Sequence, residues 1–352
     1  QTCALPILGT AYGQTGKTNL AITANQRAIT KDPKLLAAHQ NLHANYWHLK
    51  RTNDALAVLD RAAKVRGVPA DFLVGLAESY VNFAAAVPGI KTNAFPKAVA
   101  LLKRAEAMDI PDVHTRIRMA DGFNVLGERD AAAKLYENLL ADVPQAPMLQ
   151  ENLRAKLTDI YLRGKDPKRA VEQLELIIKR DALNVQAHYY LAMLAAEAGD
   201  AAKAVEHYGS VVTLNPKFEQ AYYDLASAQL SAGKTNEIFR TLGDAQKRFG
   251  ENFISEFLLG IAYARVGKYA EAVRRYTSAE VIARASDPKR LTALFYFQAG
   301  SAYERKGDYS EAVKYLEKAL ELKSDFPEAA NYLGYMWAER GENLERAKVL
   351  IE

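Results

Sequence analysis

Two short segments of the sequence have residue types and spacing that could bind a nucleotide phosphate. Residues 11–18, AYGQTGKT, and residues 228–235, AQLSAGKT, both end in Gly-Lys-Thr and carry alanine where a phosphate-binding loop has its first glycine. Such a loop needs a preceding β-strand, so that backbone N–H groups at the start of the next helix can surround the phosphates. No strand is expected before either segment. We interpret each as the end of one helix, a turn and the start of the next helix of a hairpin, and we predict no nucleotide or other cofactor.

A group of histidines near the N-terminus has a spacing that can bind zinc. His39 and His43 are four residues apart, and His48 follows about one turn later. Such a spacing can place ligands on one face of a helix. However, the sequence HQNLH lacks the glutamate that serves as the base in an HExxH metalloprotease. We interpret these residues as core or partly exposed histidines and predict no metal site.

The remaining histidines give no catalytic arrangement either. We place His114, His188 and His207 in separate repeats, with no carboxylate or cysteine at ligand spacing. No Ser/His/Asp arrangement can be singled out in the sequence. We therefore predict no catalytic residue.

All these residues lie within an internal repeat, which determines the fold. A small residue, followed three positions later by an aromatic or apolar one and then by glycine, recurs along the chain. Six of the nine separations are 34 residues, and the others are 43, 38 and 40. The small or equivalent residues are Gly9, His43, Ala77, Ala120, Thr158, Ala192, Ala226, Gly260, Gly300 and Gly334.

The sixth unit shows why the repeat predicts a helical hairpin. Apolar residues recur at helical spacing on both sides of Gly199, which indicates two amphipathic helices joined by a turn. Ala192 and Ala204 are small because the helices are expected to cross there. Gly199 can adopt the left-handed conformation that ends the first helix. Pro216 cannot continue the second helix.

Small, aromatic and turn residues at these offsets resemble the tetratricopeptide repeat (TPR) family over nearly the whole chain. The resemblance implies an all-α fold, an α-α superhelical solenoid of about ten TPR helical hairpins. We expect residues 8–352 to form a single TPR solenoid. Its repeats are expected near residues 8–35, 36–69, 70–111, 112–147, 148–184, 185–218, 219–252, 253–286, 287–326 and 327–352, the last one truncated.

Three intervals are longer than 34 residues and predict local departures from the pattern. Nine extra residues fall between residues 80 and 98, where Pro88-Gly89 predicts a loop. Four more fall near Pro144. Six precede the ninth repeat, where Asp287-Pro288 predicts an N-cap followed by a proline in the first helical turn.

The two ends of the sequence suggest a fragment. Residues 1–7, QTCALPI, resemble a translated sequencing adapter, and we expect them to be a non-native tail that includes the only cysteine, Cys3. The last repeat stops inside a helical pattern, and it resembles terminal units of long bacterial arrays. A signal peptide cannot be assessed on such a chain, which leaves the cytoplasm and the periplasm open as compartments.

Charge and hydropathy exclude several classes of partner. The chain has 46 Lys and Arg against 42 Asp and Glu, and the charges are mixed along it. This balance gives no electrostatic case for binding nucleic acid or anionic membrane. No window approaches the roughly 18 apolar residues of a membrane-spanning helix. We predict a soluble chain that has no membrane span and binds no nucleic acid.

The resemblance also implies a binding surface, because the first helices of TPR hairpins line a concave groove that takes peptide segments. One aromatic residue per repeat falls at a groove position in repeats six to nine: Tyr189, Tyr223, Phe257 and Phe297. A second row, four residues later in each repeat, passes from acidic to mainly apolar: Glu78, Asp121, Asp159, Met193, Ser227, Ile261, Ser301 and Tyr335. This pattern predicts a peptide with a basic and an apolar portion. The alternatives, in which the aromatics merely pack and the acids are merely solvated, stay open.

The expected function is that of a non-catalytic interaction scaffold for a protein or peptide partner. The alternative is the TPR region of a larger enzyme, such as a glycosyltransferase or kinase, with its catalytic domain outside this chain. Family members that bind chaperone tails clamp a terminal carboxylate with a Lys and an Asn at the two groove positions. No repeat here has that pair, and we predict no carboxylate clamp.

Overall fold

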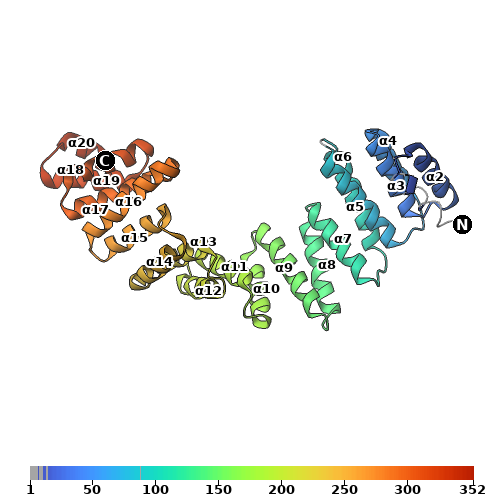
Figure 1. Ribbon diagram of the computed structural model, residues 1–352, viewed down its shortest axis with the longest axis horizontal. Helices are drawn as coiled ribbons and strands as arrows, with labels where there is room; N and C mark the ends of the chain where they lie inside the picture. Colours follow the sequence, from blue (N-terminus) through green and yellow to red (C-terminus); the bar gives the residue numbers. More distant parts are fainter. Residues whose placement is uncertain (1–6, 8–10, 13–14, 88) are drawn as a thin grey trace. The chain divides into compact units, whose positions relative to one another are not determined.

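The chain folds into helices, as the repeat predicts. The structure, a computed structural model, describes residues 7, 11–12, 15–87 and 89–352, and in these ranges it contains nineteen α-helices, one 3-10 helix and no strand. This confirms the all-α fold of about ten helical hairpins (Figure 1). Apart from Ile7, the adapter-like tail lies outside the described residues. None of the helices described is long and apolar enough to cross a membrane.

The chain divides into two compact units, residues 1–173 and 174–352. The helices of the first unit are α2 (Thr18–Lys31), α3 (Leu36–His48), α4 (Thr52–Ala63), α5 (Ala70–Ala86), α6 (Lys91–Glu106), α7 (Val113–Val125), α8 (Arg129–Asp142) and α9 (Pro147–Arg163). The boundary between the units lies within α10 (Pro167–Arg180). The helices of the second unit are α11 (Val185–Glu197), α12 (Ala201–Leu214), α13 (Glu219–Ser231), α14 (Thr235–Phe249), α15 (Phe253–Arg265), α16 (Tyr269–Ser286), α17 (Ala293–Lys306), α18 (Tyr309–Leu322), α19 (Pro327–Arg340) and α20 (Leu344–Ile351).

Helices α11 and α12 show how the repeat residues build a hairpin. Ala192 and Ala204 are both 0 % exposed, which fits a close approach of the two helices. Between the helices, Gly199 has a φ of +78°, a left-handed conformation that is strained for residues with a Cβ. The Asp200 carboxylate then accepts a hydrogen bond from the Lys203 backbone N–H and caps α12. The expected roles of the alanines and the turn glycine are confirmed.

The longer intervals mainly lengthen helices. In the third repeat, α5 has 17 residues and α6 has 16, whereas the first helix of the sixth repeat has 13. The inserted residues are thus largely helical, and the predicted loop is the short interval between Ala86 and Lys91, where Gly89 has a φ of +83°.

Before the ninth repeat, Asp287 does occupy an N-cap position with Pro288 in the first turn, but the helix that begins there is a short 3-10 helix and not the first helix of the repeat. Residues Pro288–Arg290 form a separate 3-10 turn, and the Asp287 side chain caps no backbone group there. The first helix of that repeat begins at Ala293, and its N-cap is Thr292, which accepts a hydrogen bond from the Phe295 backbone N–H. The α-helix therefore starts five residues later than the proline suggested, after a threonine that also satisfies the capping rule.

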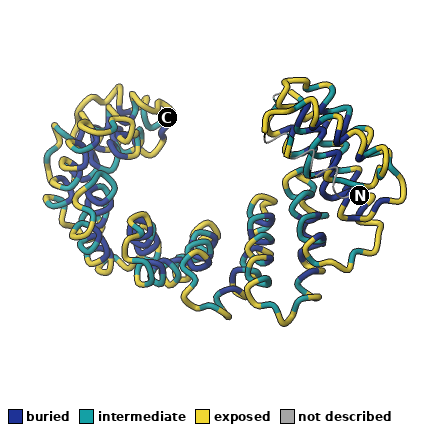
Figure 2. Tube along the Cα trace, turned by 45° about the vertical axis from the view of Figure 1, so that its right-hand side comes forward, coloured by how far each residue is buried: buried dark blue, intermediate teal, exposed yellow. Residues whose placement is uncertain are grey.

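The residues coloured as buried lie on the sides of the helices that face neighbouring helices within each unit, and the turns are mostly exposed (Figure 2). Several tyrosines in this interior reach out to a carboxylate on another helix. The Tyr161 hydroxyl donates to Glu137 at 2.5 Å, and the Tyr189 hydroxyl donates to Asp224 at 2.9 Å. Burial, reinforced by the adjacent carboxylate, raises the pKa of Tyr161 to about 12 and that of Tyr189 to about 12.

These tyrosines predict a loss of stability in alkali. A group whose pKa is higher in the folded than in the unfolded chain stabilises the fold below its unfolded pKa, about 10 for tyrosine, and loses that contribution as the pH rises through the folded value. The melting temperature should therefore fall between pH 10 and about 12. Circular dichroism melts across this range test it, and Tyr161→Phe should show a shallower fall. A flat profile up to pH 12 would contradict the prediction.

Candidate interaction site

In the first unit, the acidic residues expected in the groove lie partly exposed on the first helices of their hairpins. Glu78 is on α5, Asp121 on α7 and Asp159 on α9. Each carboxylate is paired with a basic side chain. Arg118 donates from Nε and Nη2 to Glu78 at 2.8 and 2.5 Å. The row thus carries balanced rather than purely negative charge.

The other two carboxylates are paired in the same way. Lys156 Nζ lies 2.6 Å from Asp121 Oδ1, and Arg163 Nε lies 2.9 Å from Asp159 Oδ1. The Tyr136 hydroxyl also donates to Asp121, at 2.5 Å. Mutual repulsion of free carboxylates, the reason given for a cationic partner, is therefore largely cancelled, because each acid has a cation within about 3 Å.

A cleft opens between α5, α6 and α7 at these positions. Its volume is about 280 Å³, and it is lined by both polar and apolar side chains. Glu78, Arg118 and Asp121 supply the charges, while Val81 and Val125 supply apolar surface. Val125 is 60 % exposed, although it is an aliphatic residue. Such a cleft can hold one apolar side chain next to a charged pair.

In the second unit, most of the expected groove aromatics take part in packing. Tyr223 is only 3 % exposed, and its hydroxyl is held by Glu219 and Asn252. Phe257 stacks on Phe253 with ring centroids 5.7 Å apart. This supports the interpretation that aromatics at this position pack neighbouring hairpins together.

The two outer members of this aromatic row behave similarly. Phe297 lies 5.3 Å from Phe326, and Tyr189 lies 4.8 Å from Phe218, measured between ring centroids. Both are partly buried. Tyr189 also binds Asp224 through its hydroxyl. Both Phe297 and Tyr189 are less exposed than Val125.

The second row of the same unit is more accessible. Met193 and Ile261 are partly exposed, as is Ser301, and Ser227 is exposed. Tyr335 is 57 % exposed on α19. These side chains lie on the first helices in the register that the repeat predicts.

A second cleft adjoins this row between α11, α12 and α13. It has a volume of about 270 Å³ and is lined by small residues, by Tyr208, and by three polar residues of α13: Asp224, Ser227 and Ser231. Ser227 belongs to the predicted row. In both units, therefore, a cleft of similar volume is lined by residues of that row.

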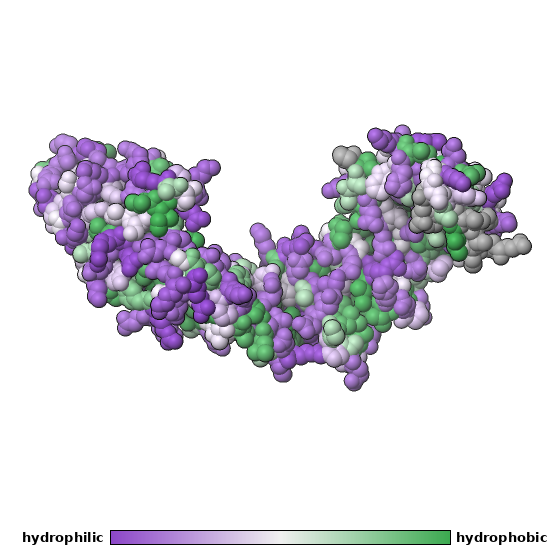
Figure 3. Space-filling view, viewed as in Figure 1, coloured by the Kyte–Doolittle hydropathy of each residue, from purple (hydrophilic) through white to green (hydrophobic). Residues whose placement is uncertain are grey.

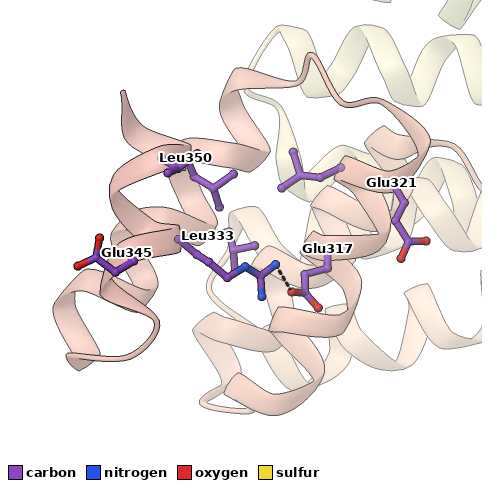
Figure 4. Close-up of a pocket in the computed structure, with 8 residues that line it drawn as sticks. Glu317, Glu321, Leu333, Glu345 and Leu350 are labelled. Carbon is purple, nitrogen blue, oxygen red and sulfur yellow. Dashed lines mark hydrogen bonds and ion pairs between the residues drawn. The ribbon is translucent and has the colours of Figure 1, made fainter.

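A cavity larger than these two clefts lies in the last hairpins (Figure 4). It measures about 650 Å³ and lies between α18, α19 and α20. Leu333 and Leu350 give it apolar walls, and Arg346 bridges to Glu317 at 2.9 Å across its edge. Val349, also in the lining, is 75 % exposed. Elsewhere, hydrophobic residues reach the face shown in Figure 3 in patches among hydrophilic ones.

The phosphate-loop-like segments have the helical geometry expected of repeat turns. Residues 228–235 form the end of α13, a turn at Gly233 and the first residue of α14. In the first segment, the described residues place Gly16 in a left-handed turn before α2 begins at Thr18. Residues 13 and 14 lie outside the described residues. Residues 228–235 continue directly from helix α13 and follow no strand, whereas residues 8–10, which precede the first segment, lie outside the described residues.

Two of the N-terminal histidines are buried packing residues. His39 Nε2 lies 2.9 Å from the Pro33 carbonyl, and His43 Nδ1 lies 3.1 Å from the Ala55 carbonyl. The His43 ring also packs edge-on against Phe83, with centroids 4.7 Å apart. Burial lowers the pKa of both imidazoles, which favours their neutral forms. His48, in contrast, is exposed.

The placement of His188 and His207 in separate repeats was wrong. They lie on α11 and α12, the two helices of one hairpin, and their Nδ1 atoms are 3.1 Å apart. Sequence reasoning missed this pair because it compared neighbours along one helix. The signal was available, since the residues lie 11 positions before and eight positions after the turn at Gly199. His114 lies in the other unit and is exposed.

Comparisons with known proteins agree with the repeat. Two segments match family models described as tetratricopeptide repeat, residues 156–217 and 253–325. No curated protein sequence matches the chain.

Solved structures with similar arrangements include a MamA protein, 26 % identical, with 49 % of this chain and 92 % of that chain covered and a TM-score of 0.44. MamA from Desulfovibrio magneticus RS-1 is 20 % identical, with 49 % and 95 % covered and a TM-score of 0.44. The APC/C hetero-tetramer Cut9-Hcn1 is 14 % identical, with 99 % and 75 % covered and a TM-score of 0.46. With all three TM-scores below 0.5, the family-model matches carry the assignment.

Proposed function

Because the chain is a tetratricopeptide repeat protein, we propose that it acts as a non-catalytic scaffold that binds a peptide segment or partner protein on the exposed faces of its first helices. Stacked repeats offer extended surfaces of this kind, and the tetratricopeptide fold is typically non-catalytic. The observation that carries the proposal is the cleft between α5, α6 and α7, which is lined by residues in the groove register.

The chemistry of this cleft indicates what the bound segment presents. Val81 and Val125 favour an apolar side chain, because contact with it removes exposed aliphatic surface from water. Beside them, Glu78 and Arg118 form an ion pair that can accept and donate hydrogen bonds to a peptide backbone or polar side chain. A partner with an apolar anchor flanked by polar groups fits better than a purely basic segment, since the carboxylates already have cations.

A matched pair of variants tests this surface. Val125→Glu puts a charge into the cleft. Val281→Glu makes the same change on α16, which is the second helix of its hairpin. The two valines are similarly exposed, Val125 at 60 % and Val281 at 63 %. Loss of a true anchor costs about 2 kcal/mol or more, or roughly thirtyfold in affinity. Val125→Glu should weaken binding of a captured partner by at least this factor, and Val281→Glu should leave it unchanged.

Site-specific photo-crosslinking gives an independent measurement. A crosslinker at position 125 should label the partner, and one at position 281 should not. Both variants must melt like the unmodified protein for the comparison to hold. Equal binding by both folded variants, or labelling from position 281 alone, would remove the cleft as the binding surface.

A further inference from the structure

His188 and His207 form a pair of imidazoles that no feature of the repeat requires. One repeat later, the position equivalent to His207 is occupied by Thr241. The hairpin can therefore be built without an imidazole there. His188 is buried, at 9 % exposure, and His207 is partly exposed on the neighbouring helix. The pair therefore lies at the edge of the hairpin, where a small ion can reach it.

The hydrogen bonds of His188 fix which of its nitrogens carries a lone pair. Its Nε2 lies 3.2 Å from the Ala182 carbonyl oxygen, which can only accept, so Nε2 carries the proton. Neutral His188 therefore presents an unprotonated Nδ1 to His207. Histidines that bind metals commonly have this arrangement, with one ring N–H donated to a backbone carbonyl and the other nitrogen left for the metal.

The separation of the two Nδ1 atoms suits shared coordination. Two imidazole nitrogens bound to one zinc ion at about 2.0–2.1 Å each, in tetrahedral geometry, lie about 3.3 Å apart. The observed separation is 3.1 Å. In the metal-free protein this distance is bridged by one proton, which His207 Nδ1 donates to His188 Nδ1. A metal ion can replace that proton if the nitrogens move apart by a few tenths of an ångström and both rings tilt toward an ion that lies beside the line between them.

We propose that His188 and His207 form a binding site for a divalent late transition metal ion, for which zinc is the probe, with both Nδ1 atoms as ligands. Imidazole suits zinc, copper and nickel among such ions. Within the described residues there is no cluster of three or more histidine, cysteine or carboxylate ligands, so water completes the coordination sphere. Binding releases the proton held between the rings.

The electrostatic surroundings agree with this geometry. Burial, and then the proximity of His188, lower the pKa of His207, while the carboxylates of Glu206 and Glu175 act in the opposite direction. The two carboxylates lie close enough to affect the charge on the ring and offset the positive charge that an ion brings.

Zinc titration of the metal-free protein tests the proposal. The protein should carry no affinity tag and should have Cys3→Ser, so that no thiol or tag histidine binds the ion. At pH 7.5 we expect one zinc ion per chain, and at a free concentration 100 times Kd the unfolding equilibrium constant should fall about a hundredfold. His207→Gln keeps an N–H donor for His188 but removes the ligand, and its zinc affinity should fall at least tenfold.

The matched control is His114→Gln, which removes an exposed histidine from the other unit and should bind zinc like the parent. A second measurement does not depend on any variant. Copper(II) bound to the parent at one equivalent should show hyperfine coupling to two imidazole nitrogens in its electron paramagnetic resonance spectrum. Equal zinc affinity of His207→Gln and the parent, or a copper spectrum without two nitrogen ligands, would overturn the site and leave the two histidines as a structural hydrogen bond.

Discussion

Replacing Arg275 by alanine should lower the free energy of unfolding by about 3–5 kcal/mol. Glu256 on α15 is 0 % exposed, and Arg275 on α16 donates to its two carboxylate oxygens at 2.9 and 3.2 Å. Without Arg275, the one hydrogen bond that the described residues of other helices still donate to the carboxylate is that from Gln246, at 2.6 Å. The large cost arises because a buried charge loses its counter-charge, whatever the net contribution of the intact pair.

The pH dependence of this variant distinguishes the mechanism from a simple loss of packing. Burial raises the pKa of Glu256, and Arg275 opposes that rise. Removing Arg275 should raise the pKa further. A carboxyl with a raised folded pKa stabilises the fold fully below its unfolded value and loses that contribution as the pH rises through the folded value. The deficit should therefore be smaller at pH 5 than at pH 7.

The neighbouring residue supplies the control for this prediction. Arg274 is 76 % exposed and paired only with Glu271, so Arg274→Ala should cost about 0.5 kcal/mol or less. Adding Glu256→Gln to Arg275→Ala should recover part of the lost stability, because the uncompensated charge is removed. Denaturant titrations measure all of these variants. If Arg275→Ala melts like Arg274→Ala, the buried pair does not stabilise the hairpin.

Replacing Gly260 by leucine should destabilise the same hairpin by about 3 kcal/mol, at the upper end of the range for overpacking. A Cβ at this position would lie 2.5, 2.7 and 2.9 Å from three ring carbons of Tyr276. The ring cannot move aside, since Tyr276 is 1 % exposed and packs against Phe257 and Phe295. Even Gly260→Ala should lower the melting temperature.

Gly209 in α12 is the matched control, because a Cβ there would meet nothing within 4 Å. Gly209→Ala should raise the free energy of unfolding by about 0.5–1 kcal/mol through the better helix propensity of alanine. Opposite signs for the two glycine-to-alanine changes would confirm the close helix approach at Gly260. The same sign for both would contradict it.

The sequence predicted those features that recur in each repeat. Gly199 and Gly267 adopt the expected left-handed conformation, with φ of +78° and +75°, since every hairpin ends its first helix in the same way. Ala204 and Ala272 are both 0 % exposed at equivalent positions. A residue type that recurs at a fixed offset indicates a requirement of the backbone or of packing. A single sequence shows this recurrence because it contains the repeat many times.

Features that depend on pairing between helices were missed. Arg118 reaches Glu78 from 40 residues away, and Lys156 reaches Asp121 from 35, so a list of acids along one row could not show that each was compensated. In both pairs the basic residue lies three positions before the residue equivalent to the acid in the next repeat, so a comparison of equivalent positions shows only another acid. Tyr223 is buried, and its hydroxyl accepts a hydrogen bond from Asn252 in the next hairpin, a contact that the periodicity of the sequence does not indicate.

The local character of the contacts has a consequence for synthesis on the ribosome. Within each unit, α5 packs mainly on α6, α15 on α16 and α17 on α18, and further contacts reach only the adjacent hairpins. A hairpin can therefore bury its apolar face as soon as the next one emerges, without waiting for the distant end of the chain. A ribosome that stalls within α16 would hold a nascent chain whose earlier hairpins are already protected from protease, with only its last hairpin exposed.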